Sequence, residues 1–355
     1  MRILRLAVGL FLFVGALQLM KEAATGLDAL KSGVLVENVG TAFGLGWLGA
    51  LLVLSGSPVA ATALALVAAG EEQAAAGAAE WFDELQGFAM LTGSRLGAAF
   101  VVLVTAVVWA LREGKGGRKV PLSTAVMALV GTAVVYLPAA PIGALLLTSP
   151  PLESLDARLP ASVVDVIDLL YGDIVDAAAR LPAPLLFLLA LGVLLLAFTV
   201  IDGALPRFDE ASMGQRKLGW LSGKWTMFML GSLVALVTMS VSVALTVLVP
   251  LVSRGRVRRE SILPYIFGAN ITTLGDTMVA AFALDSPGAV RLVLAEIIAT
   301  TLISVVLLAF FYAQVRRAVW AVQAWVVDSP VRLVGFTVCL FLVPLTTIAI
   351  SAAAF

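Results

Sequence analysis

The sequence predicts an all-α polytopic membrane protein, and two features indicate this class. Apolar residues make up 61% of its 355 residues, whereas charged residues make up only 13%. A soluble chain carries about twice that share of charge. Several apolar runs are long enough to cross about 30 Å of hydrocarbon as helices, among them Ile3–Met20, Leu185–Ile201 and Ala289–Tyr312.

Residue types that are rare or missing exclude several kinds of site. The chain has no histidine, which removes the commonest proton relay and metal ligand. Its single cysteine, Cys339, excludes an internal disulfide and a cysteine metal cluster. The formal net charge is zero, but this total hides a strong asymmetry along the chain. We therefore expect no enzyme activity, no resident cofactor, no nucleic-acid partner and a lipid bilayer as the surroundings.

The sign of the charge differs between successive connections. Basic residues gather at Arg112–Lys119, Arg216–Lys224, Arg254–Arg259 and Arg316–Arg317. Acidic residues gather at Glu71–Glu84 and Glu153–Asp176. By the positive-inside rule, the basic connections and the N-terminus face the cytoplasm. The sequence therefore predicts a multi-pass protein of the inner or plasma membrane with its acidic connections outside.

Two apolar segments are interrupted by small and polar residues and have flanks on one side of the membrane. The segment at about residues 34–70 is broken at Ser55–Pro58 between outer flanks. The segment at about residues 225–253 is broken near Thr238–Ser242 between basic flanks. Each predicts a re-entrant helical hairpin, in which two half-helices meet at a polar tip inside the membrane and return to their own side.

These features divide the chain into two repeats of opposite orientation with about seven membrane crossings. The predicted parts are a first transmembrane repeat at 1–148, an extracytoplasmic acidic connector at 149–182, a second inverted repeat at 183–314 and a C-terminal extra helix at 315–355. An odd number of crossings in the first repeat inverts the second. Inverted repeats that meet at broken helices are typical of secondary transporters.

Polar residues inside the predicted membrane segments are the candidate site. Each costs several kcal/mol in hydrocarbon unless it is satisfied, about 2–3 for a charge on insertion scales, so they must line a cavity or an ion path. The candidates lie at the two tips and in two segments that follow them, namely Ser57, Thr62, Ser94, Arg95, Ser240, Ser242, Asn270, Thr272, Thr273 and Asp276. Helix N-termini at the tips suit an anion, and unwound carbonyl groups suit a sodium ion.

The order of these motifs resembles the sodium-dependent phosphate cotransporter family, type II, with its bacterial members. That family has a Gln-Ser-Ser-Ser tip and a Gly-Ala-Asn-Ile-Gly-Thr-Thr segment in each repeat, and the resemblance covers most of Leu10–Leu284. Here the second segment keeps Gly268-Ala269-Asn270, followed by Ile-Thr-Thr, whereas the first reads Gly93-Ser94-Arg95. The tips read Gly56-Ser57-Pro58-Val59 and Met239-Ser240-Val241-Ser242, without either glutamine.

The resemblance implies a secondary active transporter of a small inorganic oxyanion, sodium-coupled phosphate symport by alternating access being the leading expectation. Sodium would bind at Ser240, Ser242, Asn270 and Thr273. Two alternatives stay open. One is a carrier of a different solute with proton coupling or no ion coupling, in which Arg95 replaces sodium. The other is a non-transporting, regulatory relative that kept the fold.

Arg95 and Asp276 each have several interpretations. The guanidinium of Arg95 could bind an oxyanion bidentately, replace a sodium ion, or pair with a carboxylate such as Asp276 to lock the repeats together. Asp276 could hold a cation, take a proton, or reach the outer interface. Thr273-Leu-Gly-Asp276 also faintly resembles a segment of intramembrane aspartyl proteases, for which Asp202 is the best second aspartate, although it lies at a helix end.

Overall fold

The computed structural model describes residues 2–26, 38–78, 81–112, 119–204, 223–255 and 257–354, and within these every regular element is helical. Seven helical stretches in this part of the chain are long and apolar enough to cross a membrane. They are Ile3–Thr25, Glu84–Arg112, Lys119–Leu147, Ala183–Ala204, Arg259–Ala283, Pro287–Ala309 and Pro330–Ala353. The predicted all-helical class and the seven apolar segments are therefore confirmed.

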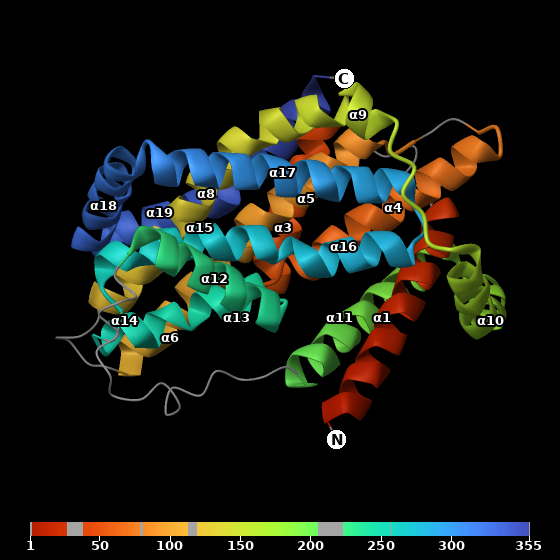
Figure 1. Cartoon of the computed structure of the whole chain (residues 1–355), viewed down its shortest axis with the longest axis horizontal. Helices are drawn as coiled ribbons and strands as arrows, with labels where there is room; N and C mark the ends of the chain where they lie inside the picture. The colour runs from red at the N-terminus through yellow and green to blue at the C-terminus, as the bar shows by residue number, and fades with distance from the viewer. Residues whose placement is uncertain are drawn as a thin grey trace.

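The elements follow one another in two comparable series (Figure 1). Up to the connector they are α1 (Arg2–Thr25), α3 (Val39–Val53), α4 (Ser57–Ala75), α5 (Glu84–Ala98), α6 (Phe100–Arg112) and α8 (Lys119–Leu147). The connector holds α9 (Pro150–Glu153) and α10 (Ala161–Ala178). Then follow α11 (Ala183–Ala204), α12 (Lys224–Thr238), α13 (Val241–Thr246), α14 (Leu248–Ser253), η2 (Arg259–Ser261), α15 (Ile262–Thr272), α16 (Leu274–Ala283), α17 (Pro287–Ala309), α18 (Tyr312–Asp328) and α19 (Pro330–Ala353).

Each of the two interrupted segments is divided into separate helices at or next to the predicted break. Leu54 ends α3 with a φ of 59°, and α4 starts at Ser57. Met239 ends α12 with a φ of 46°, and Ser240 caps α13 by accepting a hydrogen bond from the N–H of Val243. A left-handed residue turns the chain away from the helix axis, so each segment changes direction where the sequence places small and polar residues.

α3 packs closely on α5, and α12 packs closely on α15. A Cβ added to Gly93 would lie 2.1 Å from the carbonyl oxygen of Phe43, so no larger residue fits between α5 and α3. A Cβ on Gly268 would lie 1.9 Å from the carbonyl oxygen of Phe228, between α15 and α12. Small residues allow this backbone contact between membrane helices.

The reciprocal contacts recur at the same spacing. A Cβ on Gly46 would lie 2.0 Å from the carbonyl oxygen of Met90. A Cβ on Gly231, 185 positions later, would lie 2.0 Å from that of Tyr265, which follows Met90 by 175 positions. The left-handed residues that end α3 and α12 are also 185 positions apart, and Gly93 and Gly268 are 175 apart. The close contact between α3 and α5 therefore recurs, at the same spacing, between α12 and α15.

Charge separates to opposite ends of the bundle (Figure 1). The acidic end is formed by the end of α4, the start of α5, α9 and the start of α17, with Glu71, Glu72, Glu84 and Glu153. The basic end is formed by the starts of α8, α12 and α15 together with α18, with Lys119, Lys224, Arg258, Arg259, Arg316 and Arg317. Of the predicted basic segment Arg216–Lys224, residues 216–222 lie outside the described residues.

At the acidic end, ion pairs and hydrogen bonds join the two series of helices. Arg291 at the start of α17 donates to both carboxylate oxygens of Glu84 at the start of α5, with its Nε at 3.0 and 3.2 Å. Its Nη1 also donates to the carbonyl oxygens of Glu153 and Leu155 at 3.3 Å. Glu71 of α4 accepts from the backbone N–H of Gly288 at 2.8 Å. These contacts hold α4, α5 and α17 together at this end.

Of the remaining helices, α1 contacts α4, where Lys21 pairs with Glu72 at 2.9 Å. α1 and α11 lie side by side and slant away from the bundle (Figure 1), and Tyr171 of α10 donates to the carbonyl oxygen of Phe11 at 2.9 Å. α19 contacts α3, where Asn38 donates to the carbonyl oxygen of Ser351 at 3.1 Å. Only 6% of its apolar window is buried, so most of its surface is available to lipid.

The glycine contacts predict unequal effects of adding one methyl group. Gly93→Ala and Gly268→Ala should each lower the stability of the solubilised protein by about 1–3 kcal/mol, the usual range for overpacking. Gly275→Ala is the matched control, because nothing lies within 4 Å of its added Cβ. The unfolding temperature of each of the three variants is measured by heating samples and monitoring the folded peak by size-exclusion chromatography. Equal unfolding temperatures would contradict the close contacts.

The Arg291–Glu84 pair should be energetically coupled. The exposed fractions of its side chains are 18% and 25%, against 41% and 67% for the Arg332–Asp328 pair, so solvent screens it less. A double-mutant cycle with Arg291→Gln and Glu84→Gln should give a coupling of about 1 kcal/mol or more. The same cycle at Arg332 and Asp328 should give a smaller value. Equal couplings would show that the acidic end is not held by this pair.

Candidate functional site

Nine buried polar side chains from five helices form a central polar cluster. They are Thr92, Arg95, Thr132, Tyr136, Asn270, Thr273, Asp276, Thr277 and Glu296. They come from α5, α8, α15, α16 and α17, and most lie near the middle of the membrane-length stretches that carry them. The cluster therefore lies deep inside the bundle, far from both ends. Polar groups cost most at this depth.

Arg95 is the largest buried side chain of the cluster, with 1% of its surface exposed. Its Nη2 donates to the hydroxyl oxygen of Thr277. Thr277 in turn donates to Oδ1 of Asp276, from its hydroxyl at 2.9 Å and from its backbone N–H at 2.6 Å. Arg95 therefore reaches Asp276 through a threonine hydroxyl, and the direct pair considered from the sequence is replaced by a relay.

Glu296 is a fully buried carboxyl group on α17. The hydroxyl of Thr92 donates to its Oε2 at 3.0 Å. Arg95 acts on it electrostatically, and the hydroxyl of Tyr136 is influenced by Arg95, Glu296 and Asp276 together. One guanidinium and two carboxyl groups therefore share one neighbourhood inside the bundle.

Asn270 connects α15 to α8. Its Nδ2 donates to the hydroxyl of Thr132 at 3.3 Å, and its backbone carbonyl accepts from the hydroxyl of Tyr136 at 2.7 Å. The hydroxyl of Thr273 donates to the same carbonyl at 3.2 Å. These bonds fix the side chain at the turn between α15 and α16.

Several buried polar atoms of the cluster have no hydrogen-bond partner. They are Nε and Nη1 of Arg95, Oδ1 of Asn270, Oδ2 of Asp276 and Oε1 of Glu296. Buried polar atoms are paired in the great majority of cases, so each exception calls for an explanation. Two N–H-bearing nitrogens of a guanidinium suit an oxyanion, and the three oxygen atoms suit a cation or a proton.

The structure brings four predicted site residues into the cluster: Arg95, Asn270, Thr273 and Asp276. Ser94 is buried next to Arg95, but its hydroxyl donates to the carbonyl oxygen of Leu91 at 2.7 Å. A Cβ on Gly56 at the first tip would lie 3.1 Å from the carbonyl oxygen of Ser94. The first tip therefore touches α5 one residue away from Arg95.

The other predicted residues serve helix ends and helix contacts. Thr62 donates to the carbonyl oxygen of Pro58 within α4, and Thr272 donates to that of Ser232 on α12. Ser240 caps α13, and Ser57 begins α4. Among the described side chains, these four residues have no hydrogen bond to the cluster. The side chain of Ser242 lies outside the part that the structure describes.

Five members of the cluster were missed by sequence reasoning: Thr92, Thr132, Tyr136, Thr277 and Glu296. Glu296 had a usable signal, because it and Arg291 are the only charged residues of Pro287–Ala309. An acidic residue in the middle of an apolar helix is a functional-site hypothesis by itself. The threonines and Tyr136 carried no such signal, since hydroxyl groups are common in membrane helices.

Asp202, the second aspartate that a protease would need, lies on α11. No hydrogen bond joins its carboxyl group to that of Asp276 in the described part of the chain. Paired catalytic aspartates share a proton across a direct contact. The described geometry therefore does not favour the protease interpretation.

Comparison with protein-family models, with curated proteins and with solved structures gives no match for this chain. The site is therefore interpreted from its own geometry.

Proposed function

We propose that this protein is a secondary active transporter of a small inorganic oxyanion, with phosphate as the leading candidate, that works by alternating access. The observation that carries the proposal is the buried guanidinium of Arg95, which has two nitrogen atoms without a hydrogen-bond partner. A permanent cation inside a membrane bundle is costly unless it serves a polar path. Each of these nitrogen atoms could donate a charge-assisted hydrogen bond to an oxyanion, and because Nε and Nη1 lie on different edges of the guanidinium, a bidentate contact would have to pair one of them with Nη2.

We infer that the two series of helices are inverted repeats, each with a re-entrant hairpin. The equal spacing of the glycine contacts and of the left-handed residues supports two copies of one unit. The flanks of α3–α4 lie towards the acidic end and those of α12–α14 at the basic end, as opposite orientation requires (Figure 1). At the 175-residue spacing, Arg95 and Asn270 are equivalent positions. The cluster would then lie at the repeat interface.

The orientation follows from the distribution of charge. The basic end would face the cytoplasm of an inner or plasma membrane, and α1 would start on that side. The acidic connector with α9 and α10 would lie on the outer side. Seven crossings would place the C-terminal end of α19 outside.

The charges of the cluster explain why a cation would accompany the substrate. The cluster contains one guanidinium and two carboxyl groups, so a further anion is repelled while both carboxyl groups are ionised. A sodium ion held by the free oxygen atoms of Asn270 and Asp276 would offset that repulsion. Thr273, which lies on the same turn, would add a hydroxyl ligand, whereas Ser240 and Ser242 belong to the second tip. Symport of sodium with the oxyanion is the mechanism that this charge distribution favours.

Glu296 supports a second candidate, a carrier coupled to protons or to no ion. Its Oε1 has no partner and its Oε2 accepts one hydrogen bond from Thr92. A protonated carboxyl group here would remove one negative charge and leave Arg95 to attract the anion. In this second candidate, the positive charge of Arg95 replaces that of a sodium ion. A protein that binds the anion without moving it, as a regulatory relative would, differs from both in the uptake assay.

Removal of the guanidinium should abolish transport. Arg95→Gln should lower phosphate uptake into proteoliposomes at least 100-fold, because a charge-assisted contact inside a low-dielectric site is lost, and Arg95→Lys should recover only part of it. Arg180→Gln, at an exposed position, is the matched control. Size-exclusion profiles show whether each variant is folded. Normal uptake by folded Arg95→Gln would refute the role of Arg95.

The coupling ion is decided by uptake under three conditions: a sodium gradient, choline in place of sodium, and an inward proton gradient in choline. Sodium symport predicts uptake in the first condition only and continued sodium dependence in Glu296→Gln. Proton coupling predicts uptake in the third condition, lost in Glu296→Gln and kept in the exposed control Glu153→Gln. No uptake by folded wild-type protein in any condition would favour the regulatory relative.

A further inference from the structure

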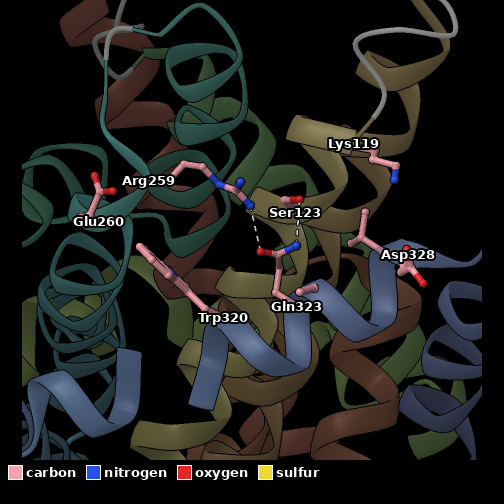
Figure 2. A pocket seen from close by; sticks show the side chains of 9 residues that line it. Lys119, Ser123, Arg259, Glu260, Trp320, Gln323 and Asp328 are labelled. Atoms are coloured by element: carbon pink, nitrogen blue, oxygen red, sulfur yellow. Dashed lines mark hydrogen bonds between the residues drawn. The ribbon is translucent and has the colours of Figure 1, made fainter. Parts of the chain in front are cut away.

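A polar pocket of about 490 Å³ lies at the basic end, away from the central polar cluster. Its walls come from the start of α8, from η2 and from α18 (Figure 2). The polar and charged residues that line it are Lys119, Ser123, Arg259, Glu260, Trp320, Gln323 and Asp328. None of them belongs to the candidate site predicted from the sequence, and Arg259 was interpreted there as a topology signal only.

A chain of hydrogen bonds fixes the floor of the pocket. Arg259 donates from Nη2 to Oε1 of Gln323 at 2.9 Å, and Gln323 donates from Nε2 to the hydroxyl of Ser123 at 3.0 Å. Figure 2 shows the guanidinium and the amide pointing towards each other across the pocket. Gln323 and Ser123 are buried, so the amide is held in place. The bond to Gln323 uses one of the five N–H groups of Arg259.

The other groups give the pocket an excess of donors. Nε1 of Trp320 is buried and has no hydrogen-bond partner, and Lys119 adds an ammonium group. The guanidinium of Arg316 lies 5.3 Å from the ring centroid of Trp320 and adds positive charge behind it. An indole N–H, an ammonium and a guanidinium only donate hydrogen bonds, so together they require an acceptor-rich anion.

The two carboxylates at the rim do not cancel this field. Asp328 is held by Arg332, whose Nη1 lies 3.4 Å from its Oδ2. Glu260 and Asp328 lie on opposite sides of the pocket, with Arg259 and Gln323 between them (Figure 2). The acidic groups therefore lie at the edges, while the guanidinium of Arg259 lies in the middle (Figure 2).

We propose that this pocket binds a phosphate group. The donors of Arg259 and Lys119 suit its acceptor oxygen atoms, and arginine binds phosphate through paired N–H groups. The group would come either from inorganic phosphate or from the headgroup of an anionic phospholipid, since the volume leaves room for both. This assignment goes beyond transport and holds whether or not the central cluster moves a solute.

The test is binding to the full-length protein in detergent. Equilibrium dialysis measures inorganic phosphate, and native mass spectrometry measures retention of added phosphatidylglycerol. The variants are Lys119→Gln, Arg259→Gln and Trp320→Phe, with Arg258→Gln as matched control, because Arg258 is an exposed neighbour that does not line the pocket. Arg95→Gln is included so that binding at the central cluster is counted separately.

A loss of at least 10-fold in affinity for one of the two ligands in Lys119→Gln and Arg259→Gln, but not in Arg258→Gln, is the expected result. The ligand that responds identifies the source of the phosphate group. A smaller loss in Trp320→Phe would assign its N–H to the site. If both ligands bind the pocket variants and the Arg258→Gln control equally well, the proposal is overturned. Lys119 is exposed, so Lys119→Gln tests the site even if Arg259→Gln does not fold.

Discussion

Backbone contact between α3 and α5, and between α12 and α15, is the constraint on which the rest of the structure depends. At Gly93 and Gly268 the neighbouring carbonyl oxygen occupies the place of a side chain. This contact fixes the position of each helix along its partner. The first tip consequently lies against the turn of α5 that carries Ser94 and Arg95. Lipid cannot satisfy an irregular backbone, so such tips persist only where protein surrounds them.

The position of Arg95 follows from that packing, and its environment follows from the helices that close around it. Arg95 gains one threonine hydroxyl and two carboxyl groups in its neighbourhood, because α17 packs against α5 and α8 and α16 packs against α17. A cation in this position, with nitrogen atoms still unpaired, distinguishes the cluster from a structural ion pair, in which direct contact would satisfy both partners. The oxyanion proposal rests on this difference.

The two ends of the bundle differ in a way that suits an alternating-access carrier. Contacts between Arg291, Glu84 and Glu71 close the acidic end. The basic end holds a pocket of about 490 Å³ between α8, η2 and α18. Leu263 and Ile266 of α15 pack on Gly131 of α8 between this pocket and the central cluster, with side-chain atoms 3.1 and 3.5 Å from an added Cβ. An apolar layer therefore separates the two polar regions along the same pair of helices.

The sequence by itself determined the helical class, the seven apolar segments and the places where two further apolar segments break. These properties depend on local composition: long apolar runs form helices in lipid, and small and polar residues interrupt them. The sequence also singled out Arg95, Asn270 and Asp276, because polar groups in apolar runs are conspicuous. It left open whether Arg95 pairs directly with Asp276.

Only the tertiary structure decided which polar groups meet. Thr277 comes between Arg95 and Asp276, and Glu296 and Tyr136 arrive from helices that are far away in the chain. The pocket around Arg259 likewise combines residues more than 100 positions apart. Contacts across such distances depend on how helices pack, which spacing along one helix does not encode. The hydroxyl groups at the tips show the opposite case. Their positions were conspicuous in the sequence, but the hydrogen bonds of Ser240 and Thr62 stay within or at the start of their own helices, α13 and α4.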